Sequence, residues 1–413
     1  MAPLEACPEN TRVEVGTDRQ AVRCAAARPA VAPYHKPANL HSGCALSILL
    51  CTFFLPMVSV AAADRVVLVD GGGGHRGVYD GAMVVNVKAR KLYAGHGAAE
   101  GEWENGLWVY DLDADGEISG TDERILPNSP DPYATAPNVR PNYFFRAVCA
   151  MALSTDGRKL YLGLCGARKT EPKPLVVYDL DTKGEPVGKP RAYEAGKDCP
   201  DISSLLLDPK LGILYCVAYG TGGIRAVTLK DGEPTDQSRV FPFGGANNYM
   251  IMPGGRMGEY MIGGRPSRVG VVSSTPDGEL VDGMDFSVGN PDAWLCLARV
   301  DHCLYFVMDD KLWSWPLDKE WKPVGKAVAH PNIPASKIMT GIHSSVYVVQ
   351  GEYTQAKDPK ARTLIGTRIA RYQPDAQGRL DKPAFLSETF NHRIMSLTVD
   401  DSTGVIYGST WPL

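Results

Sequence analysis

Long amphipathic helices are missing from this sequence. Outside residues 44–63, no stretch of 12 or more residues repeats its apolar positions with the period of a helix. This excludes α/β folds, because their parallel strands are joined by crossover helices. The sequence therefore predicts an all-β protein.

The motifs of several enzyme classes are also absent. No Gly-x-Ser-x-Gly elbow, His-Glu-x-x-His pair, kinase signature or Rossmann pattern occurs, so serine hydrolases, zinc proteases and nucleotide-binding enzymes have no support. None of the 10 cysteines lies in a Cys-x-x-Cys pair, which disfavours zinc and thioredoxin-like sites. A net charge of −4 without a basic stripe argues against nucleic-acid binding.

One long apolar run is present, at residues 44–63, and it ends in small residues. An apolar core followed by an Ala-x-Ala site predicts a signal peptide and export to the periplasm or the cell exterior. The alternative is a single membrane anchor, since about twenty apolar residues can span a bilayer. Pro56 and the small-residue end favour cleavage. Residues 1–43 are interpreted as an unstructured leader, or as the product of a start codon placed too far upstream.

Six cysteines follow Ala63, and an even number in an oxidising compartment permits disulfides. Both Cys165 and Cys199 fall on the same predicted loop face. This pair is therefore the favoured bridge, while a free buried thiol is the simpler expectation for each cysteine alone.

The chain repeats a tyrosine in a short apolar run, with strand-like runs before and after it. The tyrosines are Tyr93, Tyr161, Tyr215, Tyr260, Tyr305, Tyr347 and Tyr407, spaced 42 to 68 residues apart. Repeats of this length with three or four strands are typical of a β-propeller, in which each sheet buries the face of the next. The sequence predicts a seven-bladed propeller over residues 64–413. A large β-sandwich is the alternative.

Closure of the ring needs a strand from the N-terminal side. The seventh unit supplies its first two strands from Arg393 to Gly408, and the sequence stops at Leu413. We expect residues 65–70 to join this last blade. The blade is then still one strand short, so either it has three strands or the C-terminus is truncated.

The unit that begins at Ala152 reads Ala-Leu-Ser-Thr-Asp-Gly-Arg-Lys-Leu-Tyr-Leu, and Leu-Val-Val-Tyr-Asp-Leu-Asp follows from Leu175. It resembles the seven-bladed lactonase and YncE-like propellers over residues 65–413. The resemblance implies the fold. Some members of that group hydrolyse sugar lactones and others have no known reaction, so activity is implied only weakly. The Trp-Asp signature of WD40 repeats and the Glu-Gly-Pro motif of calcium-dependent gluconolactonases are absent.

Candidate site residues lie in the loops that lead into each first strand or follow each second strand. Because these strands are antiparallel, such loops meet at one end of the channel, where converging polar groups form the default ligand site. Arginine binds carboxylates or phosphates, and histidine can act as a general base on water. The simpler interpretation is hydrogen bonding between blades. The predicted ligand-binding residues are Arg76, Arg146, Asp201, Asn247, Arg265, Asp292 and Arg393, and the predicted catalytic residues are His75, His96 and His392.

Residues 111–122 match the start of a calcium loop. Carboxylates alternate at Asp111, Asp113 and Asp115, Gly116 permits a sharp turn, and Asp122 replaces the terminal Glu. No helices flank the loop, which excludes an EF-hand. The alternative is an Asp-rich hairpin turn. A calcium ion here would be structural, and no other cofactor is indicated.

The sequence thus predicts an exported β-propeller that serves as a binding or interaction scaffold. Its channel mouth is expected to take a small anionic molecule, a carbohydrate or a protein partner. Membrane contact is expected only through an uncleaved signal segment. The alternative is a lactonase-like hydrolase in which a histidine activates water.

Overall fold

The computed structural model describes residues 65–70, 83–96, 106–119, 123–124, 147–165, 173–195, 199, 201–218, 223–241, 247–253, 259–265, 268–275, 280–287, 297–308, 310–340, 344–355, 363–400 and 402–412. All of them belong to one compact unit, Ser59–Leu413. No helix within these residues is long and apolar enough to cross a membrane. The predicted leader and signal peptide, residues 1–63, lie outside the described residues.

The described strands form seven sheets, six of which have four antiparallel strands in chain order. The first three are β2–β5 (Met83–Asn86, Lys91–His96, Gly106–Asp111, Glu123–Arg124), β6–β9 (Ala147–Leu153, Lys159–Cys165, Leu175–Leu180, Pro186–Tyr193) and β10–β13 (Ile202–Asp208, Ile213–Ala218, Ile224–Lys230, Glu233–Phe241). The next three are β14–β17 (Asn247–Pro253, Glu259–Arg265, Arg268–Ser274, Leu280–Ser287), β18–β21 (Leu297–Val300, Cys303–Met308, Lys311–Pro316, Val328–Pro334) and β22–β25 (Lys337–Thr340, Val346–Tyr353, Leu364–Tyr372, Phe385–Leu386).

The seventh sheet combines the first described strand of the chain with the last two. It contains β26 (His392–Val399), β27 (Val405–Pro412) and β1 (Arg65–Asp70), with β27 in the middle. The strand predicted to close the ring therefore does so, and within the described residues this sheet has three strands. The direction of β1 was not predicted, because β1 runs parallel to β27, from Arg65 opposite Val405 to Asp70 opposite Thr410.

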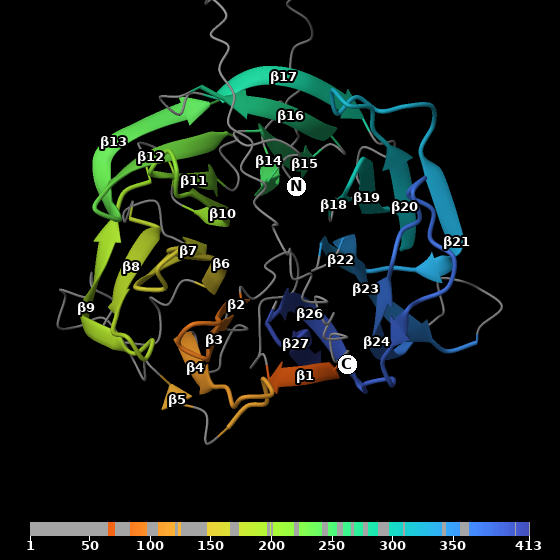
Figure 1. Ribbon diagram of the computed structural model, residues 1–413, viewed down its shortest axis with the longest axis horizontal. Helices are drawn as coiled ribbons and strands as arrows, with labels where there is room; N and C mark the ends of the chain where they lie inside the picture. The colour runs from red at the N-terminus through yellow and green to blue at the C-terminus, as the bar shows by residue number, and fades with distance from the viewer. Residues whose placement is uncertain are drawn as a thin grey trace, which may run out of the picture. The chain divides into compact units, whose positions relative to one another are not determined.

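Neighbouring sheets contact one another through their first strands, which lie innermost (Figure 1). The contacts join β2 to β6, β6 to β10, β10 to β14, β18 to β22, β22 to β26, and β26 back to β2. Both faces of the second strands are consequently covered, and every residue of β11 and β19 is buried. The arrangement is that of a β-propeller, as the repeat predicted.

Four of the recurring tyrosines join their sheet to the next. Their side chains are almost fully buried, and each hydroxyl donates a hydrogen bond to a glycine carbonyl in the turn between the third and fourth strands of the following sheet. The bonds run from Tyr93 to Gly184 (2.6 Å), from Tyr161 to Gly232 (2.7 Å), from Tyr305 to Gly378 (2.6 Å) and from Tyr407 to Gly116 (2.6 Å). The last bond closes the ring between the seventh sheet and β2–β5.

These bonds also show which ends of the sheets coincide. Each of these tyrosines is the third residue of a second strand, and each glycine lies in or beside the tight turn that follows a third strand. Both are therefore at the end of the sheet where the first strand finishes, which we call the turn end. We call the opposite end, where first strands begin and second strands finish, the loop end. At the loop end, Thr367 of β24 donates to the carbonyl of His392 in β26 at 2.6 Å.

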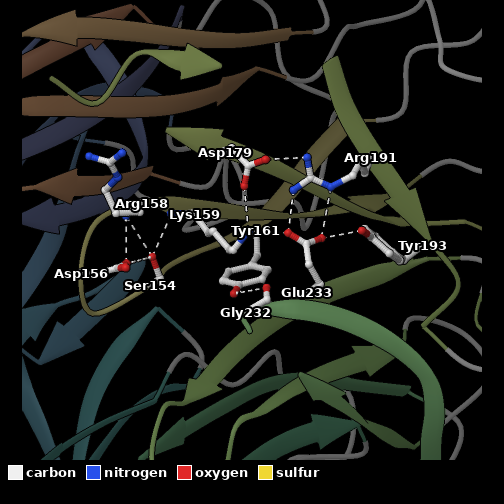
Figure 2. A network of polar contacts seen from close by, with 10 residues as sticks. All are labelled: Ser154, Asp156, Arg158, Lys159, Tyr161, Asp179, Arg191, Tyr193, Gly232 and Glu233. Atoms are coloured by element: carbon white, nitrogen blue, oxygen red, sulfur yellow. Dashed lines mark hydrogen bonds and ion pairs between the residues drawn. The ribbon is translucent and has the colours of Figure 1, made fainter. Parts of the chain in front are cut away.

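At the turn end between β6–β9 and β10–β13, charged side chains form a closed network (Figure 2). The Glu233 carboxylate accepts hydrogen bonds from Arg191 (2.7 Å), from the Tyr193 hydroxyl (2.5 Å) and from Lys159. The Asp179 carboxylate accepts from Arg191 (2.6 Å) and Lys159 (2.7 Å). Two cations thus face two carboxylates, and the charges balance.

The network changes the acidity of its members. Hydrogen bonds from Arg191 and Lys159 lower the pKa of Asp179 to about 2. Burial alone would raise the pKa of Glu233, but the hydrogen bonds from Arg191, Lys159 and Tyr193 lower it below its usual value. Both carboxylates are therefore ionised at neutral pH and stabilise the contact between the two sheets.

Candidate functional site

The residues predicted from the sequence to bind ligand lie at the loop end, as far as the structure describes them. His96 is the last residue of β3, and Arg265 is the last residue of β15, opposite Asn247 at the start of β14. His392 and Arg393 begin β26. Asp201 immediately precedes β10. The predicted residues His75, Arg76, Arg146 and Asp292 lie outside the described residues.

The side chains of two of these residues are placed at the ring rim. His392 is half-buried and Arg393 is exposed. Because the carbonyl of His392 accepts the Thr367 hydroxyl, the start of β26 is held against the start of β24. Arg393 is therefore presented at the boundary between the sheet β22–β25 and the seventh sheet.

Tyr353, the last residue of β23, lies between charges from two other sheets. Burial raises the pKa of its hydroxyl, the negative charge of Asp310 raises it further, and the positive charge of Arg393 lowers it. Asp310 precedes β20, so three sheets contribute to this group. The Tyr353 side chain is 39% exposed. We call Asp310, Tyr353 and Arg393 the rim cluster.

Gly351 allows the Tyr353 ring to fold back onto β23. A Cβ at Gly351 would lie 2.8 Å from Cε2 of Tyr353 and 3.0 Å from its hydroxyl oxygen, closer than real side chains approach. The aromatic ring therefore lies against the Cα of Gly351, and the Tyr353 side chain stays partly exposed.

A chain of polar contacts lies beside the rim cluster, in strands β23 and β24. Arg368 contacts Glu352 (Nη1 to Oε1, 3.2 Å) and donates from Nε to the side-chain oxygen of Gln350 at 3.1 Å. The Gln350 amide nitrogen in turn donates to the Tyr372 hydroxyl at 2.9 Å. Gln350 and Tyr372 are buried, whereas Arg368 and Glu352 are about one-third exposed, at 34% and 32%. Hydrogen-bonding groups are thus held in fixed positions at this edge.

Sequence reasoning missed most of this group. Arg368 and Gln350 lie opposite each other in the β23–β24 ladder, and Tyr372 lies four residues after Arg368, on the same face of β24. A usable signal was present: the apolar run that begins at Val346 turns polar at Gln350 and Glu352, before the strand ends. Two polar residues on one face of a buried strand indicate that this face reaches the rim.

The predicted calcium loop lies at the turn end. Oδ1 of Asp113 accepts the backbone N–H groups of Asp115 and Glu117, both at 2.9 Å. Asp111 contacts the ammonium group of Lys91 at 2.5 Å. Asp113 therefore holds the turn, and Asp111 forms an ion pair with Lys91 on the neighbouring strand of the same sheet. Asp122 lies outside the described residues.

The same turn recurs without any calcium motif. Asp181, Asp318 and Asp375 each accept two backbone N–H groups in the way Asp113 does. Within the described part of the chain, no three His, Cys, Asp or Glu side chains are grouped to hold a metal. Calcium binding at residues 111–122 therefore stays a prediction.

The predicted disulfide is wrong, because Cys199 is a free, buried thiol. Cys149, Cys216 and Cys303 are free and buried as well. Cys199 and Cys216 belong to the apolar cluster between β6–β9 and β10–β13. They are packing residues, in agreement with the expectation of a free buried thiol.

Comparison with known proteins was informative only at the level of structure. No protein-family model matches the sequence, and no curated protein matches it significantly. The periplasmic gluconolactonase of Pseudomonas aeruginosa has a TM-score of 0.52 at 12% identity, with 76% of this chain and 86% of that chain covered.

Two further solved structures show the same fold. A protein from Lactobacillus plantarum has a TM-score of 0.51 at 13% identity, covering 75% of this chain and 85% of its own. A chain of the mitotic checkpoint complex has a TM-score of 0.54 at 13% identity, covering 83% of this chain and 87% of its own. Identities this low establish architecture and not activity. The chain has the fold of the lactonase-like β-propellers.

Proposed function

We propose that this protein is a binding scaffold for a small sugar acid or a related anion at the rim cluster. The observation that carries the proposal is that Asp310, Tyr353 and Arg393 lie at the loop-end termini of strands from three sheets, with the charges of Asp310 and Arg393 both acting on Tyr353. Propellers gather residues from distant parts of the chain in this way, and a concave rim with a few convergent polar groups is the usual kind of ligand site.

The chemistry of the rim cluster suits a ligand with a polyhydroxyl body and one negative charge. The partly exposed side chain of Tyr353 can stack against the C–H face of a sugar. The Arg393 guanidinium can bind a carboxylate through two parallel hydrogen bonds. Nearby, Arg368 and Glu352 offer donors and acceptors to hydroxyl groups.

The test is calorimetric titration with D-gluconate, with D-glucose as the uncharged comparison. We expect gluconate to bind and Arg393→Ala to weaken its binding about tenfold or more, since one charge-assisted hydrogen-bonded contact is lost. Arg379→Ala is the matched control, because Arg379 is an exposed arginine at the turn end, paired with Asp375. Failure of gluconate to bind, or equal binding by Arg393→Ala, would refute the proposal.

Lactone hydrolysis is the second candidate. It is favoured by His392, which begins β26 at the loop end, since a histidine can act as a general base on water. Turnover of D-glucono-δ-lactone above the protein-free background, lost in His392→Ala but kept in His330→Ala, would establish the enzyme. His330 is the matched histidine because it lies on β21, hydrogen-bonded to Ser314.

We also propose that the protein is exported. The proposal rests on the apolar run at residues 44–63 with its small-residue end. Expression of the full chain, cell fractionation and N-terminal mass spectrometry are expected to give a protein that begins at Asp64. A membrane-bound product that retains residues 44–63 would instead identify an anchor.

A further inference from the structure

Arg225 is a buried arginine at the loop end of the interface between β6–β9 and β10–β13. It is the second residue of β12 and lies opposite Cys216 of β11 and Val240 of β13. Cys216 packs with Leu175 and Val177 of β8, so this face of the sheet is turned toward β6–β9. Only 4% of Arg225 is exposed.

The guanidinium of Arg225 has no anionic partner within the described part of the chain. Its Nε and Nη1 atoms are buried without a hydrogen bond. Arginine stays protonated even when buried, because its intrinsic pKa is far above neutral pH. A buried, unpaired charge is costly, so such a group normally has a partner of opposite charge.

The two thiols beside Arg225 do not supply that charge. Burial raises the pKa of Cys199 to about 11, although the positive charge of Arg225 opposes this shift. Burial likewise raises the pKa of Cys216. Both are neutral thiols near pH 7. The carboxylate of Asp201 also acts on Cys199, while Nε and Nη1 of Arg225 stay without a hydrogen bond.

Gly223 makes room for the guanidinium at the loop end. Its φ of +122° is a conformation that other residues rarely adopt. A Cβ at this position would lie 3.0 Å from Nη1 of Arg225 and 3.0 Å from the carbonyl oxygen of Phe241. Because Gly223 directly precedes β12, the guanidinium lies against the backbone at the loop end.

We infer that Arg225 is a binding site for the carboxylate of a small organic acid, separate from the rim cluster. One unpaired positive charge calls for one negative charge, which a carboxylate supplies and a doubly charged phosphate exceeds. The neighbours Ala195, Cys199, Cys216 and Ile202 are each fully buried and apolar or weakly polar. They favour an acid with a short apolar body.

The experiment follows thermal unfolding with sodium propionate as the probe and propionamide as its uncharged counterpart. Propionate is expected to raise the unfolding midpoint of the unsubstituted protein, because it binds only the folded state. Arg225→Met keeps the apolar stem and removes the charge, and it is expected to weaken propionate binding about tenfold or more. Propionamide is expected to have no effect.

Two controls separate a ligand site from a structural role. Arg191→Met removes an arginine of the same interface that is already paired, so the midpoint should fall while the response to propionate persists. Arg379→Ala, which removes an exposed arginine of the turn end that is paired with Asp375, should leave the propionate response unchanged. Gly223→Ala should abolish the response while Arg225 remains.

Three results would overturn the inference. The first is the absence of any propionate effect on the unsubstituted protein. The second is an equal effect on Arg225→Met. The third is stronger stabilisation by inorganic phosphate than by propionate, which would exclude a carboxylate as the preferred anion.

Discussion

Two arginines at one interface between sheets differ in their burial and in their hydrogen-bond partners. Arg191, at the turn end, binds Asp179 and Glu233, and its side chain is still 36% exposed. Arg225, at the loop end, is almost completely buried and has two nitrogens without a hydrogen bond. From exposure alone, the buried Arg225 would be expected to have the ion pairs and not the exposed Arg191, because water can compensate an exposed charge and not a buried one. The turn end thus holds the two sheets together through ion pairs, whereas the loop end is where we propose that ligands bind.

The repeated contacts of the turn end support this division. Lys91 contacts Asp111 of its own sheet and Glu185 of the next sheet. In the same way, Lys159 contacts Asp179 of its own sheet and Glu233 of the next. At the ring closure a different residue takes this role. There Arg65 of β1 binds Glu117 at 2.8 Å, because Val405 occupies the position equivalent to the lysines.

The largest effect is expected from Glu233→Gln. The change removes one of two carboxylates that face Lys159 and Arg191, so unfolding should become easier by about 2 kcal/mol, a value reduced for partial exposure. Denaturant titration measures the change. Glu194→Gln is the control, since Glu194 is an exposed neighbour of Tyr193. Equal losses in the two variants would show that the network adds no stability.

A smaller loss is expected from Tyr407→Phe. Removing the hydroxyl leaves the carbonyl of Gly116 without its donor at the ring closure, at a cost of about 1 to 2 kcal/mol. Tyr353→Phe, at the exposed rim, should change stability by less than about 0.5 kcal/mol. Denaturant titrations of both variants make the comparison, and a neutral Tyr407→Phe would contradict the importance of the tyrosine bonds.

The pH dependence of Asp179 gives an effect of about 1 kcal/mol, after allowance for its exposure. Its pKa is lowered to about 2 in the folded state, so the unfolded chain binds the proton more tightly. The stabilisation is therefore complete above about pH 4 and is lost as pH falls toward 2. Unfolding of the unsubstituted protein and Asp179→Asn, measured from pH 6 to pH 2, should converge at the acid end. A constant difference would be inconsistent with this ion pairing.

The smallest effect on stability is expected at the rim cluster. Arg393→Ala removes an exposed side chain, and the free energy of unfolding should change by less than about 0.5 kcal/mol. Chemical denaturation provides the measurement. A loss as large as that of Glu233→Gln would show that the loop end is structural too.

The architecture was largely predictable from the sequence, because the repeat is local. Each hairpin unit needs only neighbouring residues, such as the turn at Asp156 and Gly157 before Tyr161. The closing role of residues 65–70 followed from counting strands. The parallel direction of β1 could not be predicted in this way, since strand direction depends on how the chain enters the last sheet.

The candidate sites were only partly predictable. Arg393 and His392 could be placed at the loop end because their positions in the repeat are fixed. Arg225 could not be identified, because its sequence neighbours Ile224 and Ala226 mark an ordinary strand. Its burial and lack of partners depend on contacts with a neighbouring sheet. Likewise, nothing local predicts that Glu233 meets Lys159, which is 74 residues away.

The strand that closes the ring has a consequence for biosynthesis. Thr410 donates a hydrogen bond to the carbonyl of Val69, 341 residues earlier in the chain. During translation the other six sheets can assemble in the order in which they emerge from the ribosome, but β1 has no partner until β27 is made. The apolar sequence Val-Val-Leu-Val of β1 is therefore exposed longest, and it is the segment of the propeller that we expect a chaperone to hold.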